Sequence, residues 1–264
     1  MSKETNSLKI LSDEDCTNAW KACFENAQRH QVSASLVAGP ERYGTAITLL
    51  VLGTEEYVKG FLYWLQSNHI NIRNVKGIQL FFTDHVIRHT LAFMISMCFD
   101  LCREFMGMVY KLRDQLHEQR EPAWTAFQAA AMSKDDNKME SLMMPMMTLM
   151  DWWQEANDKK NGGLYVGTTS KPGELQTPDA ITKEQYEYGV QVVNEFGKRL
   201  QVIIDYIEGL NEEHKILFAA TANNDGMLEV IAKVTEGCMA QRKKKTSIIE
   251  SLIADMKKIN RADS

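Results

Sequence analysis

Two adjacent carboxylates and a lysine close an apolar segment of the sequence, GTAITLLVLGTEEYVK, at residues 44–59. The run of leucine and valine leaves almost no polar face, so we expect a helix that neighbouring helices cover. Glu55 and Lys59 are four residues apart and can pair on one face of this helix, whereas Glu56 points about 100° away. One acid can therefore be structural while the other is available for chemistry.

Two histidines and an arginine follow in the hexapeptide DHVIRH. His85 and His89 are four residues apart, a spacing at which two imidazoles can bind a divalent metal together with a carboxylate from Glu55 or Glu56. These histidines and Arg88 can instead pair with the same carboxylates as a buried polar network without metal, which is the interpretation we favour. The sequence contains neither HExxH nor the paired ExxH motif of di-iron bundles, and we expect no resident metal and no cofactor.

Cationic and imidazole groups around paired carboxylates can also hold a phosphodiester and transfer protons, as metal-independent ribonucleases do. The candidate catalytic residues for this chemistry are Glu55, Glu56, Lys59, His85, Arg88 and His89. Spacing alone does not choose between the polar network and the ribonuclease. Nucleotide hydrolysis, dinucleotide chemistry and esterase activity have no support, because the sequence lacks a P-loop, a GxGxxG motif after a strand and a GxSxG motif.

The composition predicts an all-α protein. The chain has 264 residues with 44% hydrophobic and 25% charged residues, which is typical of a soluble globular protein, and only 5 prolines and 15 glycines. A formal net charge of −5 gives no general attraction to nucleic acid, and we interpret the basic run at 242–245 as a solvated helix face.

The cysteines and the apolar runs predict a cytoplasmic protein without a membrane anchor. Five cysteines without CxxC spacing indicate reduced thiols rather than a disulfide framework or a zinc ribbon. No signal peptide precedes the first helix, and no uncharged run approaches the roughly 18 residues of a membrane span.

The pattern along the chain predicts a short tail, one main helical domain and a helical extension. We expect the tail at 1–12, the domain at 13–210 and the extension, packed on the same domain, at 211–264. The expected helices begin at Ser12 or Asp13 and end before Gly39-Pro40, then span 41–67, 75–118, a segment from Glu121-Pro122, 139–156, a segment from Thr182 to about 208 with a Thr182–Gln185 capping box, and two segments divided near 223–226.

A long loop is expected at 158–177, where the sequence reads DKKNGGLYVGTTSKPGELQT. Loops of this length in compact domains are usually functional or disordered. The Leu-Tyr-Val triplet inside the loop is apolar and argues for docking.

Several of these stretches together resemble the AbiV-type abortive infection proteins. A helix with an Asn-Ala step leads through a glycine to a second helix that closes in Glu-Glu-x-x-Lys, and a His-x-x-basic step and a Lys-Asn-x-x-Leu-Tyr-Val turn follow before a proline. The residues that carry the resemblance are Asn26, Ala27, Glu55, Glu56, Lys59, His85, Arg88, Lys160, Asn161, Leu164, Tyr165, Val166 and Pro178. The resemblance covers roughly residues 13–205.

This resemblance implies a HEPN-like helical bundle, often dimeric, with additional C-terminal helices and a role in bacterial defence against phage. It also implies binding residues, for which the candidates are Asn26, Lys160, Asn161 and Tyr165. Many HEPN relatives are metal-independent ribonucleases that use an arginine followed by a histidine after about four to six residues. This chain departs from that pattern, because three residues separate Arg113 from His117, and Arg88 is adjacent to His89.

Two hypotheses about mechanism therefore remain open. In the first, the protein binds a phage or host component and arrests phage multiplication, for instance by blocking translation. In the second, it is a HEPN ribonuclease that cleaves RNA with residues assembled across a dimer. Under either hypothesis we expect a homodimer, a phage or host protein as trigger, and no membrane; the dimer forms either through the helix from Met139 to Trp153 or through the C-terminal helices.

Overall fold

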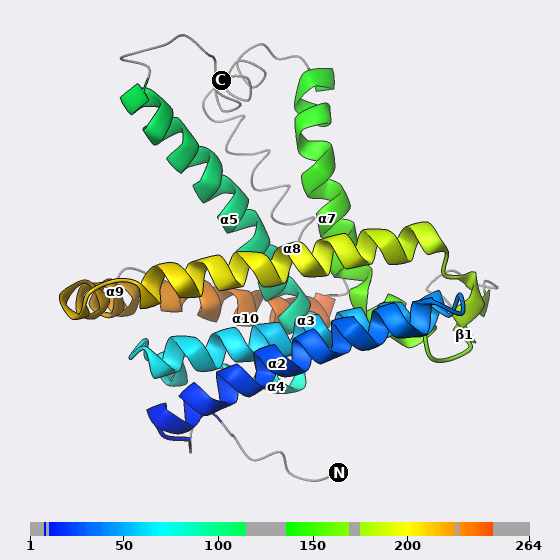
Figure 1. Ribbon diagram of the computed structural model, residues 1–264, viewed down its shortest axis with the longest axis horizontal. Helices are drawn as coiled ribbons and strands as arrows, with labels where there is room; N and C mark the ends of the chain where they lie inside the picture. The colour runs from blue at the N-terminus through cyan, green and yellow to red at the C-terminus, as the bar shows by residue number, and fades with distance from the viewer. Residues whose placement is uncertain (1–7, 9–10, 115–135, 169–174, 225–226, 245–264) are drawn as a thin grey trace. The chain divides into compact units, whose positions relative to one another are not determined.

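The computed structural model describes residues 8, 11–114, 136–168, 175–224 and 227–244, and these residues are overwhelmingly helical (Figure 1). The all-α prediction is confirmed, with only a minimal antiparallel ladder between β1 (Gly167–Thr168) and β2 (Leu175–Gln176). The helices are α2 (Asp13–Ala38), α3 (Tyr43–Ser67), η1 (Ile72–Asn74), α4 (Leu80–Thr83), α5 (His85–Asp114), α7 (Asp136–Gly162), η2 (Pro178–Ala180), α8 (Lys183–Glu208), α9 (Glu212–Asn224) and α10 (Met227–Lys244).

The chain divides into two compact units. The described residues of unit 1 come from Met1–Glu25, Val58–Arg88 and Tyr206–Ser264, and those of unit 2 from Asn26–Tyr57 and His89–Asp205. The helices α2, α3, α5 and α8 contribute residues to both units. The boundary at residue 210 that the sequence suggested stays a prediction.

Two helix starts form as the sequence predicts. Ser12 and Asp15 make a reciprocal pair before α2, since the Ser12 N–H donates to Asp15 Oδ2 and the Asp15 N–H donates to Ser12 Oγ, both at 3.0 Å. The bond from the Ser12 hydroxyl also holds the pKa of Asp15 below its ordinary value. Thr182 and Gln185 form the same kind of capping box before α8, at 3.0 and 3.3 Å.

The single helix expected at 75–118 is wrong, because the backbone breaks at Asp84. This residue is extended, with φ −115° and ψ 116°, and separates α4 from α5. Its Oδ1 accepts hydrogen bonds from the backbone N–H groups of Val86 at 3.0 Å and Ile87 at 3.4 Å. Asp84 therefore acts as the N-cap of α5, a role that a side-chain carboxylate fills well.

Polar side chains attach the segment that follows α3 to the start of α2 and to the end of α9. Arg73 Nη2 donates to Asp13 Oδ1 at 3.1 Å, at the start of α2. The Asn223 amide, at the end of α9, donates to the His69 carbonyl at 3.0 Å and accepts from the Asn71 N–H at 2.8 Å. These bonds hold the connection in place over an apolar core, and they fix α9 to the rest of unit 1.

Aromatic residues and glycines shape the core of unit 2. Trp152 and Trp153, both 2% exposed, are core residues of α7, and the ring of Trp153 lies 5.6 Å from that of Phe196 in α8. A β-carbon on Gly189 would lie 2.4 Å from the Trp152 ring, so only glycine lets α7 and α8 pack this closely. Trp153 therefore does not form a dimer surface.

Some expectations fall on parts of the chain that the structure does not describe. These are the helix start at Glu121-Pro122, the side chains of Arg113 and His117, the basic run at 242–245, and the side chains of Cys102 and Cys238. Among the described cysteines, Cys16, Cys23 and Cys98 take part in no disulfide.

The cap of α5 leads to a first prediction. Asp84→Ala removes the acceptor for two helix N–H groups and should lower the free energy of unfolding by about 1 kcal/mol. Asp84→Asn keeps an acceptor oxygen, so its free energy of unfolding should fall by less. Urea unfolding followed by circular dichroism measures both variants. Equal losses for alanine and asparagine would contradict the capping role.

Candidate functional site

A buried group of charged side chains lies at the centre of unit 2. The carboxylate Oε1 of Glu55 lies 3.1 Å from Lys160 Nζ and 3.3 Å from His89 Nε2. The exposed fractions of these residues are 4% for Glu55, 8% for Lys160 and 2% for His89. Because burying a charge is costly unless it is paired, Lys160 compensates the charge of Glu55 inside the unit. We name Glu55 and Lys160 the buried pair.

The backbone of α3 and the end of α7 fit together beside this pair. The Thr48 hydroxyl donates to the Lys160 carbonyl at 2.8 Å. A β-carbon on Gly163 would lie 2.2 Å from the Gly44 carbonyl oxygen and 2.5 Å from Thr48 Oγ1, so no other residue fits there without moving α3. Lys160 is thus held by both its backbone and its side chain.

The loop expected from residue 158 begins later than the sequence suggested. The helix α7 continues to Gly162, and Lys160 lies in its last turn, buried, rather than in a surface loop. The prediction of Lys160 as a loop residue that binds a partner is therefore wrong about its location. Helical spacing does not point to the pairing of Lys160 with Glu55, because 105 residues separate the two.

The other carboxylate and the remaining candidates lie in less buried positions. Glu56 in unit 2 and Lys59 in unit 1 are both half-buried, and both have polar partners. Asn26 is half-buried in α2. Of the expected network of both histidines and Arg88 with the carboxylates, unit 2 contains the contact of His89 with Glu55.

His85 and Arg88 form a pair in unit 1. Arg88 Nη2 lies 2.7 Å from His85 Nδ1, and Arg88 Nη1 donates to the Phe81 carbonyl at 3.0 Å. Arg88 is 4% exposed, whereas His85 is half-buried. Since a guanidinium can only donate, Nδ1 of His85 is the acceptor and the proton of the neutral ring sits on Nε2.

The described residues contain no group of three or more histidine, cysteine or carboxylate side chains placed to hold a metal ion. His89 contacts Glu55 and His85 contacts Arg88, so each of the two histidines proposed as metal ligands has a protein partner.

An apolar triplet projects from the end of α7. Leu164, Tyr165 and Val166, which we name the apolar tip, are 46%, 66% and 66% exposed. The Asn161 carbonyl accepts hydrogen bonds from the N–H groups of Leu164 at 3.1 Å and Tyr165 at 2.8 Å, which fix the turn out of the helix. The side chain of Asn161 is on the surface, next to the tip.

A protein-family model described as AbiV, of the HEPN type, matches residues 15–198. The chain belongs to the AbiV family. Membership indicates a role in abortive infection, the bacterial defence against phage. The AbiV match includes the buried pair, the His85–Arg88 pair and the apolar tip, and it ends within α8, so α9 and α10 lie beyond it.

Searches of curated proteins and of solved structures each found no match to this AbiV-family chain. None of the helices that the structure describes has both the length and the apolar character needed to cross a bilayer.

The buried pair leads to a second prediction. Lys160→Met leaves the Glu55 carboxylate buried without its cation and should lower the free energy of unfolding by about 3 to 5 kcal/mol. Combining it with Glu55→Gln removes both charges and should recover part of that loss. Chemical denaturation of the two variants gives the comparison.

Lys198→Met is the matched control, because Lys198 pairs with Glu195 at 3.1 Å on the surface of the same unit. Exposed pairs contribute roughly 0 to 1 kcal/mol, so this variant should stay close to the wild type. If Lys160→Met were as mild as Lys198→Met, the buried pair would not be the structural centre of unit 2.

Proposed function

We propose that this AbiV-family protein defends against phage by binding a protein of the phage or the host through its apolar tip, and that this binding arrests phage multiplication. Blocking translation is one route to that arrest. The observation that supports the proposal is the exposure of three consecutive apolar side chains, 46–66%, on a turn whose base is fixed.

The base of the tip suits a binding surface. The bonds from Thr48 to the Lys160 carbonyl and from Lys160 to Glu55 hold the end of α7, and Gly163 leaves no gap beside α3. A turn already held in one place loses little conformational entropy when a partner binds, which favours affinity. Covering apolar surface at the tip removes it from water and so favours association.

The burial of Glu55 and Lys160 supports binding rather than catalysis as the role of unit 2. Glu55 contacts both His89 and Lys160, and all three residues are nearly inaccessible to solvent, so a substrate cannot reach them in this conformation. Their arrangement supports a structural role as the foundation of the tip. Action as a homodimer in the cytoplasm remains part of the proposal, and light scattering of the purified protein measures the oligomeric state.

A third prediction tests the tip. Leu164→Ser combined with Tyr165→Ser should reduce protection, measured as the efficiency of plating of a sensitive phage, by about tenfold or more, because the partner loses its apolar contacts. The melting temperature should change little, since both side chains face solvent. Val202→Ser is the control, because Val202 is 55% exposed on α8 of the same unit.

Full protection by the double variant would overturn the proposal. If the melting temperature of the double variant fell so far that most of the protein were unfolded, the tip would instead be needed for the fold. Plating efficiency and thermal unfolding are therefore measured on the same variants.

Ribonuclease activity is the second candidate function, and the His85–Arg88 pair is the observation that favours it. The guanidinium occupies Nδ1 and orients the ring, so the Nε2–H can donate a hydrogen bond to a phosphate oxygen of RNA while the neighbouring 2′-hydroxyl attacks phosphorus and its proton passes through water to the departing 5′-oxygen. His85 would be the catalytic residue, and Arg88, which is buried, would position it. Such a site needs no metal.

A fourth prediction separates the two candidates. If binding is the mechanism, purified protein with EDTA leaves total cellular RNA, including transfer RNA, intact, and His85→Ala behaves as the wild type. Cleavage by the wild type that His85→Ala abolishes, with the fold retained by circular dichroism, would establish the ribonuclease instead.

A further inference from the structure

The helix α9 exposes its two large aliphatic residues to solvent. The residues that it buries against unit 1 are the small Ala219 and Ala222. Ile216 and Leu217, its large aliphatic residues, are 70% and 61% exposed. Phe218, the aromatic residue of α9, is half-buried, whereas the two aliphatic residues before it are exposed side by side in the sequence. Single exposed apolar residues are common, but a cluster of large ones marks a surface suited to a partner.

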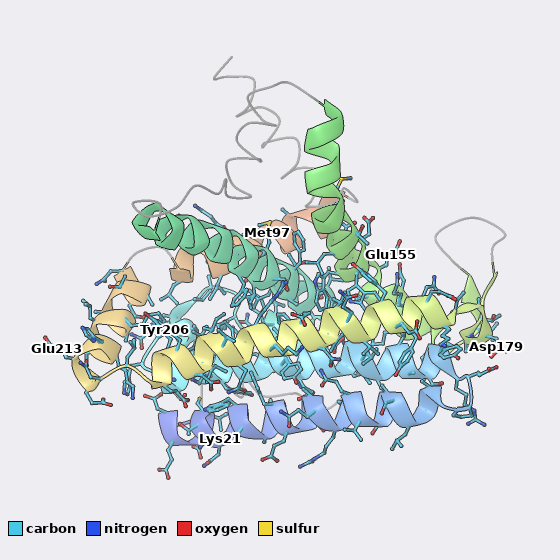
Figure 2. The ribbon with its side chains drawn as sticks, turned by 45° about the horizontal axis from the view of Figure 1, so that its top comes forward. Lys21, Met97, Glu155, Asp179, Tyr206 and Glu213 are labelled. Atoms are coloured by element: carbon cyan, nitrogen blue, oxygen red, sulfur yellow. The ribbon has the colours of Figure 1, made fainter. Side chains whose placement is uncertain are left out.

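A third large exposed side chain precedes these two by about ten residues. Tyr206, 69% exposed, is in the last turn of α8, and only Gly209, Leu210 and Asn211 connect that helix to α9. Figure 2 shows Tyr206 and Glu213 at the same corner of unit 1. We name Tyr206, Ile216 and Leu217 the corner patch.

The corner patch is held in place rather than frayed. Asn211 Oδ1 caps α9 by accepting from the His214 N–H at 2.9 Å. At the other end of α9, the two bonds of Asn223 to the connection after α3 fix the helix. The end of α8 is tied down by the bond from Trp64 Nε1 to Glu208 Oε1 at 3.3 Å.

Three carboxylates lie between Tyr206 and Ile216 in the sequence. Glu208, Glu212 and Glu213 are all exposed. Lys215, the lysine of the same stretch, already pairs with Glu212 at 3.1 Å. The stretch from Tyr206 to Leu217 therefore combines large exposed apolar side chains with an excess of carboxylates, and a complementary surface is apolar with lysine or arginine.

We infer that the corner patch is a docking site for a helix of another protein that presents apolar side chains flanked by lysine or arginine. The site lies in the part of the chain beyond the family match at 15–198, so it is an addition to the AbiV domain. The corner patch and the apolar tip have no residue in common. The inference about the patch does not depend on the proposed function.

The test is fluorescence anisotropy of a labelled amphipathic helical peptide of leucine and lysine, titrated with the full-length protein. A peptide with glutamate in place of lysine is the probe for charge. The wild type should bind the lysine peptide at least about tenfold more tightly than the glutamate peptide, with an affinity that falls as salt rises.

Variants then locate the binding. Ile216→Ser combined with Leu217→Ser should weaken binding of the lysine peptide about tenfold, and Glu212→Gln with Glu213→Gln should reduce its salt dependence. Val32→Ser combined with Leu36→Ser is the matched control, because these residues are 59% and 72% exposed on α2 and belong to unit 2. This control should bind as the wild type does.

Three results would overturn the inference. The first is equal binding of the two peptides, or unchanged binding by the Ile216→Ser, Leu217→Ser variant. The second is a wild-type dimer that this variant converts to a monomer in light scattering, since a second copy would then occupy the patch. The third is faster proteolysis after Lys244 in this variant alone, which would make the chain's own C-terminal segment the occupant.

Discussion

The architecture of unit 2 depends on the compensation of one buried charge. Glu55 is placed in an apolar helix, and without a cation beside it the carboxylate would oppose folding. Lys160 supplies that cation from a helix more than a hundred residues away, so the pair joins α3 to α7 and holds the end of α7 at a defined position. The tight backbone contact at Gly163 and the bond from Thr48 follow from the same approach of the two helices.

This placement separates conspicuous charged residues of the sequence from solvent. The carboxylate, imidazole and ammonium that look catalytic in the sequence are brought together, but they are enclosed. The enclosed group fixes the position of the residues that follow Lys160. The His85–Arg88 pair is different, because its imidazole is only half-buried and its arginine is the buried partner, and this is where an enzymatic activity would have to reside.

Local features of the fold could be predicted from the sequence, and features that depend on distant residues could not. The Thr182–Gln185 capping box and the break between α9 and α10 follow from neighbouring residues, and both form. The break at Asp84 was missed because an acid between apolar residues also fits the polar side of a continuous helix. The pairing of Glu55 with Lys160 was missed because helical spacing suggested Lys59, and only the tertiary structure shows how close α7 comes.

The contact at Gly163 separates two kinds of variation in this chain. Residue 163 is fixed, since any side chain there would collide with Gly44 and Thr48. The three residues that follow it meet no such barrier. Substitution at 164–166 would therefore change the exposed surface while the backbone contact at Gly163 stays in place, so the chemistry of the apolar tip can be altered without rebuilding the helices that carry it.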